Sequence, residues 1–259
     1  MNLEAEEEIL IDVNELAKDY DYYQVSGISI SPDNKKMAFG VDTLSRRIYT
    51  IKVKDIGTGK MYPDKIHGVN SYTTWASDSK TMFYTGKDEQ TLRSDKIFRH
   101  TLGESQDDDT LVYEEKDETF STYVYPSKSR EYIMISSTST MATEYRFLSS
   151  KTPLESFKVL QKRERGLEYS PSHVGDMFYI STNIDESTNF KLVKTPITST
   201  EKSNWRDVIP HREDVLIEDT DFFNDFMVIG ERSNGLLKIR IKSWDGKEAV
   251  SYTHLTLPT

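Results

Sequence analysis

The sequence contains no cysteine, which excludes a disulfide framework and any metal site built from thiolates. It also lacks an apolar run of about 18 residues, so we expect no segment that spans a membrane. Residues 1–20 are acidic and do not show the charged and then apolar order of a secretory signal. Together these absences make a cytoplasmic location the expectation.

Basic residues are in the minority, with 33 Lys and Arg against 43 Asp and Glu and a net charge of -10. This balance argues against a nucleic-acid partner, because phosphates need a basic face. It suits the attraction of cationic ligands, although a solvated acidic surface explains the charge more simply.

The motifs of common catalytic sites are absent as well. No Gly-x-Ser-x-Gly nucleophile elbow occurs, and Gly57 and Gly59 form a turn without the continuation of a phosphate-binding loop. The five histidines are scattered, without the paired spacing of metal ligands. From its residues alone, the chain therefore has no predicted catalytic residue, cofactor or metal.

The stretch from Gly27 to Asp42, GISISPDNKKMAFGVD, is the clearest structural signal. Two alternating runs flank a Ser-Pro-Asp-Asn turn, and this pattern predicts a β-hairpin. Pro32 presets φ for the turn, while Asp33 and Asn34 tolerate its tight backbone.

The same pattern returns along the chain. Turns fall near Asp33, Asp78, Ser129, Gly175 and Asn224, roughly 45 to 51 residues apart. Each is followed by an apolar strand-like run, then by a third run and, in most units, by a fourth. Four strands per repeat predict the blades of a β-propeller, whereas a β-sandwich would lack the four-strand repeat. No long segment of helical period occurs, which disfavours α/β folds.

These boundaries predict an all-β fold with about five four-stranded blades. Residues 1–22 are an opening segment with a short first strand at Ile9 to Ile11 and a turn of helix near Asn14 to Lys18. Residues 23–250 form the propeller, with the fifth blade incomplete after Lys242. Residues 251–259, SYTHLTLPT, fit no strand pattern, and we interpret them as a non-native tail joined to a truncated frame.

Several collinear segments resemble oligopeptidase B of the prolyl oligopeptidase family of serine peptidases. They include EILIDVNELAKDYDYY, LSRRIYTIKVKDIGTGKMYPD, WASDSKTMFYTGKD and KRERGLEYSPSHVGDMFYISTN. The resemblance extends from about Glu6 to Lys242. It implies the start of a seven-bladed propeller that acts as a lid over an α/β-hydrolase domain carrying a Ser-Asp-His triad.

The resemblance therefore implies the non-catalytic, substrate-gating part of an enzyme that hydrolyses short peptides after Arg or Lys. Its partners would be the hydrolase domain of the same parent chain and short basic oligopeptides. The last two blades and the hydrolase domain have no counterpart in this sequence, so we expect it to be inactive alone. We also expect it to be poorly stable, because blades without neighbours leave apolar surface in water.

Two residues are matched to positions in the family. Arg47 corresponds to an arginine that faces the hydrolase domain and takes part in interdomain ion pairing. Glu115 falls where related enzymes offer a propeller side chain to the substrate, and a carboxylate there would suit a cationic peptide. Both could instead be ordinary exposed charges, for which an ion pair contributes about 0–1 kcal/mol.

Two other functions remain open at this stage. A stand-alone propeller that binds proteins would need a complete ring with an exposed apolar patch. A prolyl-specific oligopeptidase would share the fold, but RERGLEYS and LSRRIYT favour the branch that cleaves after basic residues.

Overall fold

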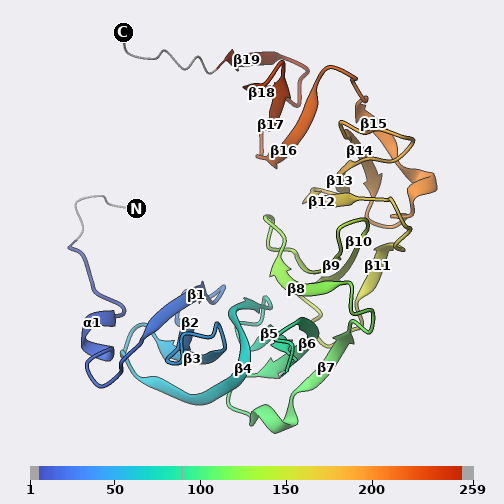
Figure 1. Cartoon of the computed structure of the whole chain (residues 1–259). Coiled ribbons are helices and arrows are strands. Elements are labelled where there is room, and N and C mark those ends of the chain that lie inside the picture. The colour runs from blue at the N-terminus through green and yellow to red at the C-terminus, as the bar shows by residue number, and fades with distance from the viewer. Residues whose placement is uncertain (1–5, 89, 253–259) are drawn as a thin grey trace. The chain divides into compact units, whose positions relative to one another are not determined.

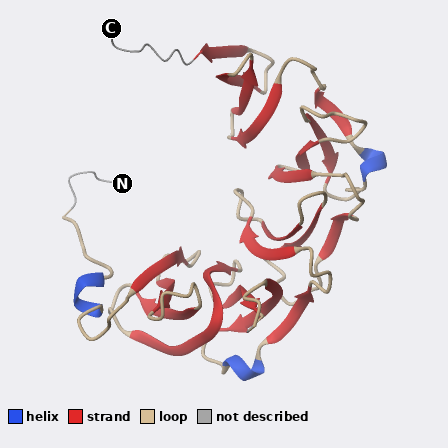
Figure 2. Ribbon diagram, viewed as in Figure 1, coloured by secondary structure: helices blue, strands red, loops and turns tan. Residues whose placement is uncertain are grey.

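The computed structural model describes residues 6–88 and 90–252, and β-strands make up most of them (Figure 1, Figure 2). Helix in these ranges is limited to one short α-helix, α1 (Val13–Leu16), and two 3₁₀ turns, η1 (Gln106–Asp108) and η2 (Lys202–Asn204). In the described part of the chain, no helix is long and apolar enough to cross a membrane.

The chain divides into two compact units. The first contains Met1–Pro126, Arg130–Ser137 and Phe147–Lys158, and the second contains Ser127–Ser129, Thr138–Arg146 and Val159–Thr259. The residues of one sheet, which consists of β8 to β11, are divided between the two units.

The first unit holds a seven-stranded antiparallel sheet in which every strand pairs with the next in the sequence. Its strands are β1 (Gln24–Ile30), β2 (Lys36–Asp42), β3 (Tyr49–Asp55), β4 (Met61–Trp75), β5 (Thr81–Lys87), β6 (Ser94–Thr101) and β7 (Thr110–Glu114).

The long strand β4 makes two blades out of this one sheet. Its first part pairs with β3 from Met61 to Val69, and its second part pairs with β5 from Val69 to Trp75. The outer strand of the first blade therefore continues directly into the inner strand of the second. Gly68, with φ of +73°, lies where one part gives way to the other.

Three four-stranded sheets follow, one for each remaining blade. The third blade consists of β8 (Ser121–Pro126), β9 (Tyr132–Thr138), β10 (Thr143–Ser149) and β11 (Lys158–Gln161). The fourth consists of β12 (Tyr169–Val174), β13 (Met177–Thr182), β14 (Lys191–Pro196) and β15 (Arg206–Ile209). The fifth consists of β16 (Leu216–Phe222), β17 (Phe226–Ser233), β18 (Leu236–Ser243) and β19 (Glu248–Tyr252). The predicted all-β propeller fold is confirmed.

The predicted hairpin from Gly27 to Asp42 is formed by β1 and β2. Ser31 closes its turn, because the backbone N–H of Asn34 and that of Ser31 donate to the carbonyls of Ser31 and Lys36. The carboxylate of Asp33 accepts hydrogen bonds from the Ser31 hydroxyl and the Lys35 N–H. The Asp33 N–H donates to Ser79 Oγ at 3.0 Å, which joins the equivalent turns of the first two blades.

Apolar side chains from adjacent blades form the core. In the first unit one cluster contains Ala38, Ile51, Val53, Ile66, Val69, Trp75, Met82 and Tyr84, and a second contains Ala76, Phe83, Ile97, Val124, Ile133, Ile135 and Leu148. In the second unit one cluster contains Tyr179, Leu192, Ile209, Ile217, Phe222, Met227 and Ile229. Their members come from successive strands at alternate positions, so the period-2 pattern predicted most of this core.

The opening segment differs from its prediction. No strand forms at Ile9 to Ile11, and the first strand is β1. Leu10 and Ile11 instead pack as irregular chain against Met37, Phe39 and Val41. The Leu10 carbonyl accepts a hydrogen bond from Lys54 Nζ at 2.6 Å, so a side chain supplies the partner that a neighbouring strand would have supplied. The predicted turn of helix is present as α1.

The fifth blade differs as well. We expected it to be incomplete after Lys242, but β19 pairs with β18 from Glu248 to Tyr252 and gives the blade a fourth strand. Ser251 and Tyr252 of the interpreted tail therefore belong to a strand. Residues 253–259 lie outside the described residues, so the origin of the tail stays a prediction.

Candidate functional site

A pocket of about 590 Å³ lies in the first unit, between the inner strands β4 and β8. The loop between β2 and β3, which carries Arg47, and the end of β5, which carries Lys87, complete its wall. We call this cavity the basic pocket, because three of its lining residues are cations: Arg47, Lys87 and Arg93.

The local fold of the β2–β3 loop brings Arg47 to the basic pocket. Asp42, at the end of β2, is fully buried, and its carboxylate accepts hydrogen bonds from Leu44 N at 2.8 Å and Arg47 N at 2.7 Å. The backbone of Arg47 has φ of +56°. This conformation costs a non-glycine residue free energy and persists only where its surroundings hold it. Asp42 supplies that constraint and leaves the exposed Arg47 side chain at the pocket.

Lys87 is coupled to the same loop. Its Nζ donates a hydrogen bond to the carbonyl oxygen of Arg47. Burial lowers the pKa of Lys87, the nearby Arg47 charge lowers it further, and Asp42 opposes the shift only in part. The two cations, Arg47 and Lys87, therefore lie close together at this end of the basic pocket.

Arg93 has a structural role at the pocket. Its guanidinium donates to the carbonyl oxygens of Phe120 at 2.8 Å, Glu115 at 3.1 Å and Asp117 at 3.2 Å. These bonds hold the loop that joins β7 to β8, and thus fix the start of the inner strand of the third blade.

Glu115 lies in the same loop, but it does not line the basic pocket. Its side chain is buried, with the residue only 3% exposed. One carboxylate oxygen accepts from the Tyr113 hydroxyl at 2.6 Å and the other from Asp117 N at 3.0 Å. Of the two residues matched to the family, Arg47 is an exposed charge at a pocket and Glu115 is a buried, hydrogen-bonded carboxylate. Their roles toward a hydrolase domain or a substrate stay predictions.

Sequence reasoning missed the walls of the basic pocket. Tyr72 of β4 and Tyr123 of β8 are exposed, Tyr72 at 65%, although both lie on inner strands. The hydroxyl oxygen of Thr73 is buried and has no hydrogen-bond partner among the described residues. The alternation of aromatic and small polar residues in SYTTW and STYVYP was the available signal, but it also fits an ordinary propeller strand.

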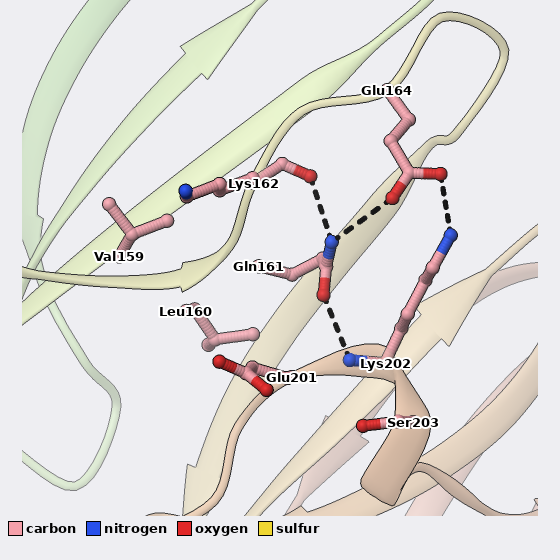
Figure 3. A pocket seen from close by; sticks show the side chains of 8 residues that line it. All are labelled: Val159, Leu160, Gln161, Lys162, Glu164, Glu201, Lys202 and Ser203. Atoms are coloured by element: carbon pink, nitrogen blue, oxygen red, sulfur yellow. Dashed lines mark hydrogen bonds and ion pairs between the residues drawn. The ribbon is translucent and has the colours of Figure 1, made fainter.

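A second pocket, of about 520 Å³, lies in the second unit beside β11 and η2 (Figure 3). The side chain of Gln161 spans it: its Oε1 accepts from Lys202 N at 2.8 Å and its Nε2 donates to the Lys162 carbonyl at 3.0 Å. Glu164 pairs with Lys202 Nζ at 2.5 Å. The side chains of Gln161, Glu164 and Lys202 are thus engaged with neighbouring groups of the chain, which favours a structural joint over a ligand site.

Among the described residues, two buried histidines contact carboxylate or serine side chains. His100 lies buried between Asp64 and Asp109 in the first unit. In the second unit, Ser129 Oγ lies 2.8 Å from Nδ1 of the buried His173 and 2.9 Å from Ser127 Oγ. No group of three or more His, Cys, Asp or Glu side chains within the described ranges is arranged to hold a metal ion.

The family described as "Prolyl oligopeptidase, N-terminal beta-propeller domain" matches residues 1–259. The chain belongs to this family. This membership agrees with the five blades described above and with the resemblance found in the sequence.

Two of the curated relatives of this chain are bacterial proteins. This chain is 40% identical over 242 residues to "Dipeptidyl aminopeptidase BI" of Pseudoxanthomonas mexicana. The match covers 93% of this chain and 33% of that protein. The chain is 31% identical over 238 residues to "Protease 2" of Moraxella lacunata, which covers 91% of this chain and 34% of that protein. The chain thus spans about a third of the length of these relatives.

Solved structures with the same fold include two oligopeptidases B. The structure from Leishmania major has a TM-score of 0.86 and 29% identity, with 91% of this chain and 33% of that chain covered. The closed form from Trypanosoma brucei with covalently bound antipain has a TM-score of 0.85 and 26% identity, with 97% and 36% covered.

Proposed function

We propose that this chain is the substrate-gating propeller of a serine oligopeptidase that hydrolyses short peptides after Arg or Lys. The observation that carries the proposal is the collinear match of nearly the whole chain to one third of curated peptidases and of oligopeptidases B. In this proposal the propeller supplies no catalytic group, and selects substrates by size at the opening to a catalytic domain.

The proposed partner is a catalytic α/β-hydrolase domain in the same parent protein. Homologues pair their propeller with such a domain. Arg47 would face this domain, and Glu115 would act on the substrate only through the loop that it holds. Cleavage after basic residues is supported by the resemblance to oligopeptidase B, and a cytoplasmic location stays a prediction.

Expression of the complete reading frame that contains this chain tests the proposal. We expect the full-length protein to cleave a blocked Arg reporter peptide of a few residues, to be inhibited by a serine-directed reagent, and to leave folded proteins intact. The 259-residue chain alone should show no turnover. Inhibitor-sensitive cleavage by the chain alone would contradict the proposal, and loss of that cleavage in Ser129→Ala would assign it to the Ser129–His173 pair.

A second activity is favoured by one relative, whose name is "Dipeptidyl aminopeptidase BI". Such an enzyme removes dipeptides from a free N-terminus. Paired reporter peptides of the same sequence, one with a free and one with an acetylated N-terminus, separate the two activities. Faster cleavage of the free form favours the aminopeptidase, whereas equal or faster cleavage of the acetylated form favours the endopeptidase.

A further inference from the structure

The basic pocket differs in charge from the rest of this acidic chain. None of its described lining residues is Asp or Glu, although the chain has ten more acidic than basic residues. The pockets at β11, at the β6–β7 loop and at the β10–β11 loop each include carboxylates: Glu164 and Glu201, then Asp64, Glu104 and Asp107, then Asp78, Glu104 and Glu155. The described lining of the basic pocket therefore favours an anion more than the linings of these other pockets do.

One cation of the basic pocket is available to a ligand. No carboxylate of the described residues lies within salt-bridge distance of the Arg47 guanidinium. Arg93, by contrast, donates to three carbonyl oxygens and lies 3.9 Å from a carboxylate oxygen of Asp95. Lys87 donates a hydrogen bond from Nζ to the carbonyl oxygen of Arg47 and adds a second positive charge beside it. A guanidinium presents parallel N–H donors that match the two oxygens of a carboxylate, so Arg47 suits that ligand best.

The remaining walls suit the residue that would carry the carboxylate. The rings of Tyr72 and Tyr123 offer apolar surface that is exposed in this structure. Asn70 and Ser71 line the pocket beside them with polar groups, and no partner for the hydroxyl of Thr73 is found within residues 6–88 and 90–252. A volume of about 590 Å³ falls within the range of roughly 300–1,000 Å³ found for small-molecule sites. It would hold the end of a peptide.

We propose that the basic pocket binds the C-terminal carboxylate of a peptide, with Arg47 on the carboxylate and Tyr72 and Tyr123 against the last side chain. If the proposed peptidase function holds, the site would hold the C-terminal end of a short substrate within the propeller. The binding itself does not depend on that function.

Binding is tested by calorimetry with the protein expressed from the complete reading frame that contains this chain. The probe is acetyl-Ala-Ala-Phe with a free carboxylate, and the matched probe is the same peptide with a C-terminal amide. Neither contains Arg or Lys, so peptidase activity plays no part in the result. We expect the acid to bind at least about tenfold more tightly than the amide, as a charged hydrogen-bonded pair provides.

Three variants locate the site. Arg47→Gln should remove most of the difference between acid and amide, while Arg46→Gln, an exposed arginine of the same loop outside the pocket lining, should leave it unchanged. Tyr123→Ala should weaken both peptides by a similar factor of about three to ten, as the loss of an aromatic contact does. Equal binding of acid and amide, or an equal effect of the two arginine variants, would overturn the proposal.

Competition distinguishes the possible sources of the anion. We expect inorganic phosphate and acetate to displace the peptide acid only at concentrations far above its dissociation constant. Displacement by acetate at the same concentration would identify a small-anion site and reject the peptide. If Arg47→Gln alters hydrolysis but leaves peptide-acid binding unchanged, Arg47 serves an interdomain ion pair, and the carboxylate proposal is rejected while the peptidase function stands.

Discussion

Nδ1 of His100 lies 2.6 Å from Oδ1 of Asp109, in a site where His100 is only 1% exposed. On the other side of the ring, Nε2 lies 3.0 Å from Oδ1 of Asp64. An imidazole donates hydrogen bonds from both nitrogens only when it is protonated. The two carboxylates therefore select the imidazolium form of a histidine that joins β6 to β4 and to the start of β7.

This arrangement predicts a stability that falls with rising pH. Burial by itself lowers the pKa of His100, but the hydrogen bonds and charges of Asp109 and Asp64 outweigh it and raise the pKa above its ordinary 6.5. A group with a raised pKa in the folded state stabilises fully below its unfolded pKa and loses that contribution as pH rises through the folded pKa. We expect the free energy of unfolding in urea to decrease from pH 6.5 toward pH 9.

Two variants check the assignment to His100. His67→Gln, which alters an exposed histidine, should keep the pH dependence. His100→Gln at pH 7 should lower the free energy of unfolding by about 3–5 kcal/mol, because it leaves two buried carboxylates without their cation. A stability that does not change between pH 6.5 and 9 would show that His100 is not held as the imidazolium.

The close approach of the first two inner strands predicts a strong effect of Gly27→Ala. Gly27 has φ of +66°, and a Cβ there would lie 2.1 Å from the carbonyl oxygen of Ser71. Gly68→Ala is the matched control, because Gly68 has a similar φ of +73° but open space around it. We expect Gly68→Ala to cost about 1–2 kcal/mol for the left-handed backbone, and Gly27→Ala to cost clearly more. Equal thermal midpoints of the two variants would contradict the close packing.

Burial predicts a structural role for Glu115. Glu115→Ala leaves the Tyr113 hydroxyl and the Asp117 N–H without the acceptor that each now has, and we expect a loss of about 1–3 kcal/mol in urea unfolding. Glu114→Ala, at the exposed neighbouring position, should change the stability by less than about 0.5 kcal/mol. If the Glu115 variant instead keeps full stability and loses activity in the full-length protein only toward cationic peptides, the substrate role holds.

The exposed outer part of the fifth blade leads us to expect that copies of the 259-residue chain associate with one another. Leu237, Ile239 and Ile241 alternate along β18 and remain exposed, so they form an apolar row in water. Replacement of all three by Thr keeps strand propensity and removes most of this apolar surface. We expect light scattering of the variant to show association only at severalfold higher concentration. Association at an unchanged concentration would place the contact elsewhere.

Much of the fold could be predicted because each blade repeats a local pattern. A hairpin is predicted by a few neighbouring residues, namely the turn at Ser31 to Asn34 and the alternation of Met37, Phe39 and Val41. The failure at Ile9 to Ile11 has a physical reason: an apolar run of three residues shows no more than burial, and here a lysine side chain supplies the carbonyl partner. Likewise, β19 forms through backbone pairing with β18, and the sequence pattern did not predict that pairing.

The candidate site was less predictable. The family resemblance drew attention to Arg47, but not to the pocket that it lines. That pocket depends on the meeting of β4 and β8, about fifty residues apart in the sequence, and no local pattern contains such a meeting. The sequence also says nothing of the burial of Glu115, because Glu114 and Glu115 look alike until the chain folds.

The strand shared by the first two blades has a mechanical consequence. In the other blades a loop separates the outer strand from the next inner strand, but β4 runs through without a break. A force applied to the N-terminal hairpin would therefore be transmitted along β4 and would shear the hydrogen bonds between β4 and β5. No loop lies between the two blades that could extend first. The first two blades should yield in a single rupture event, and their amides should exchange with solvent deuterium at a common slow rate.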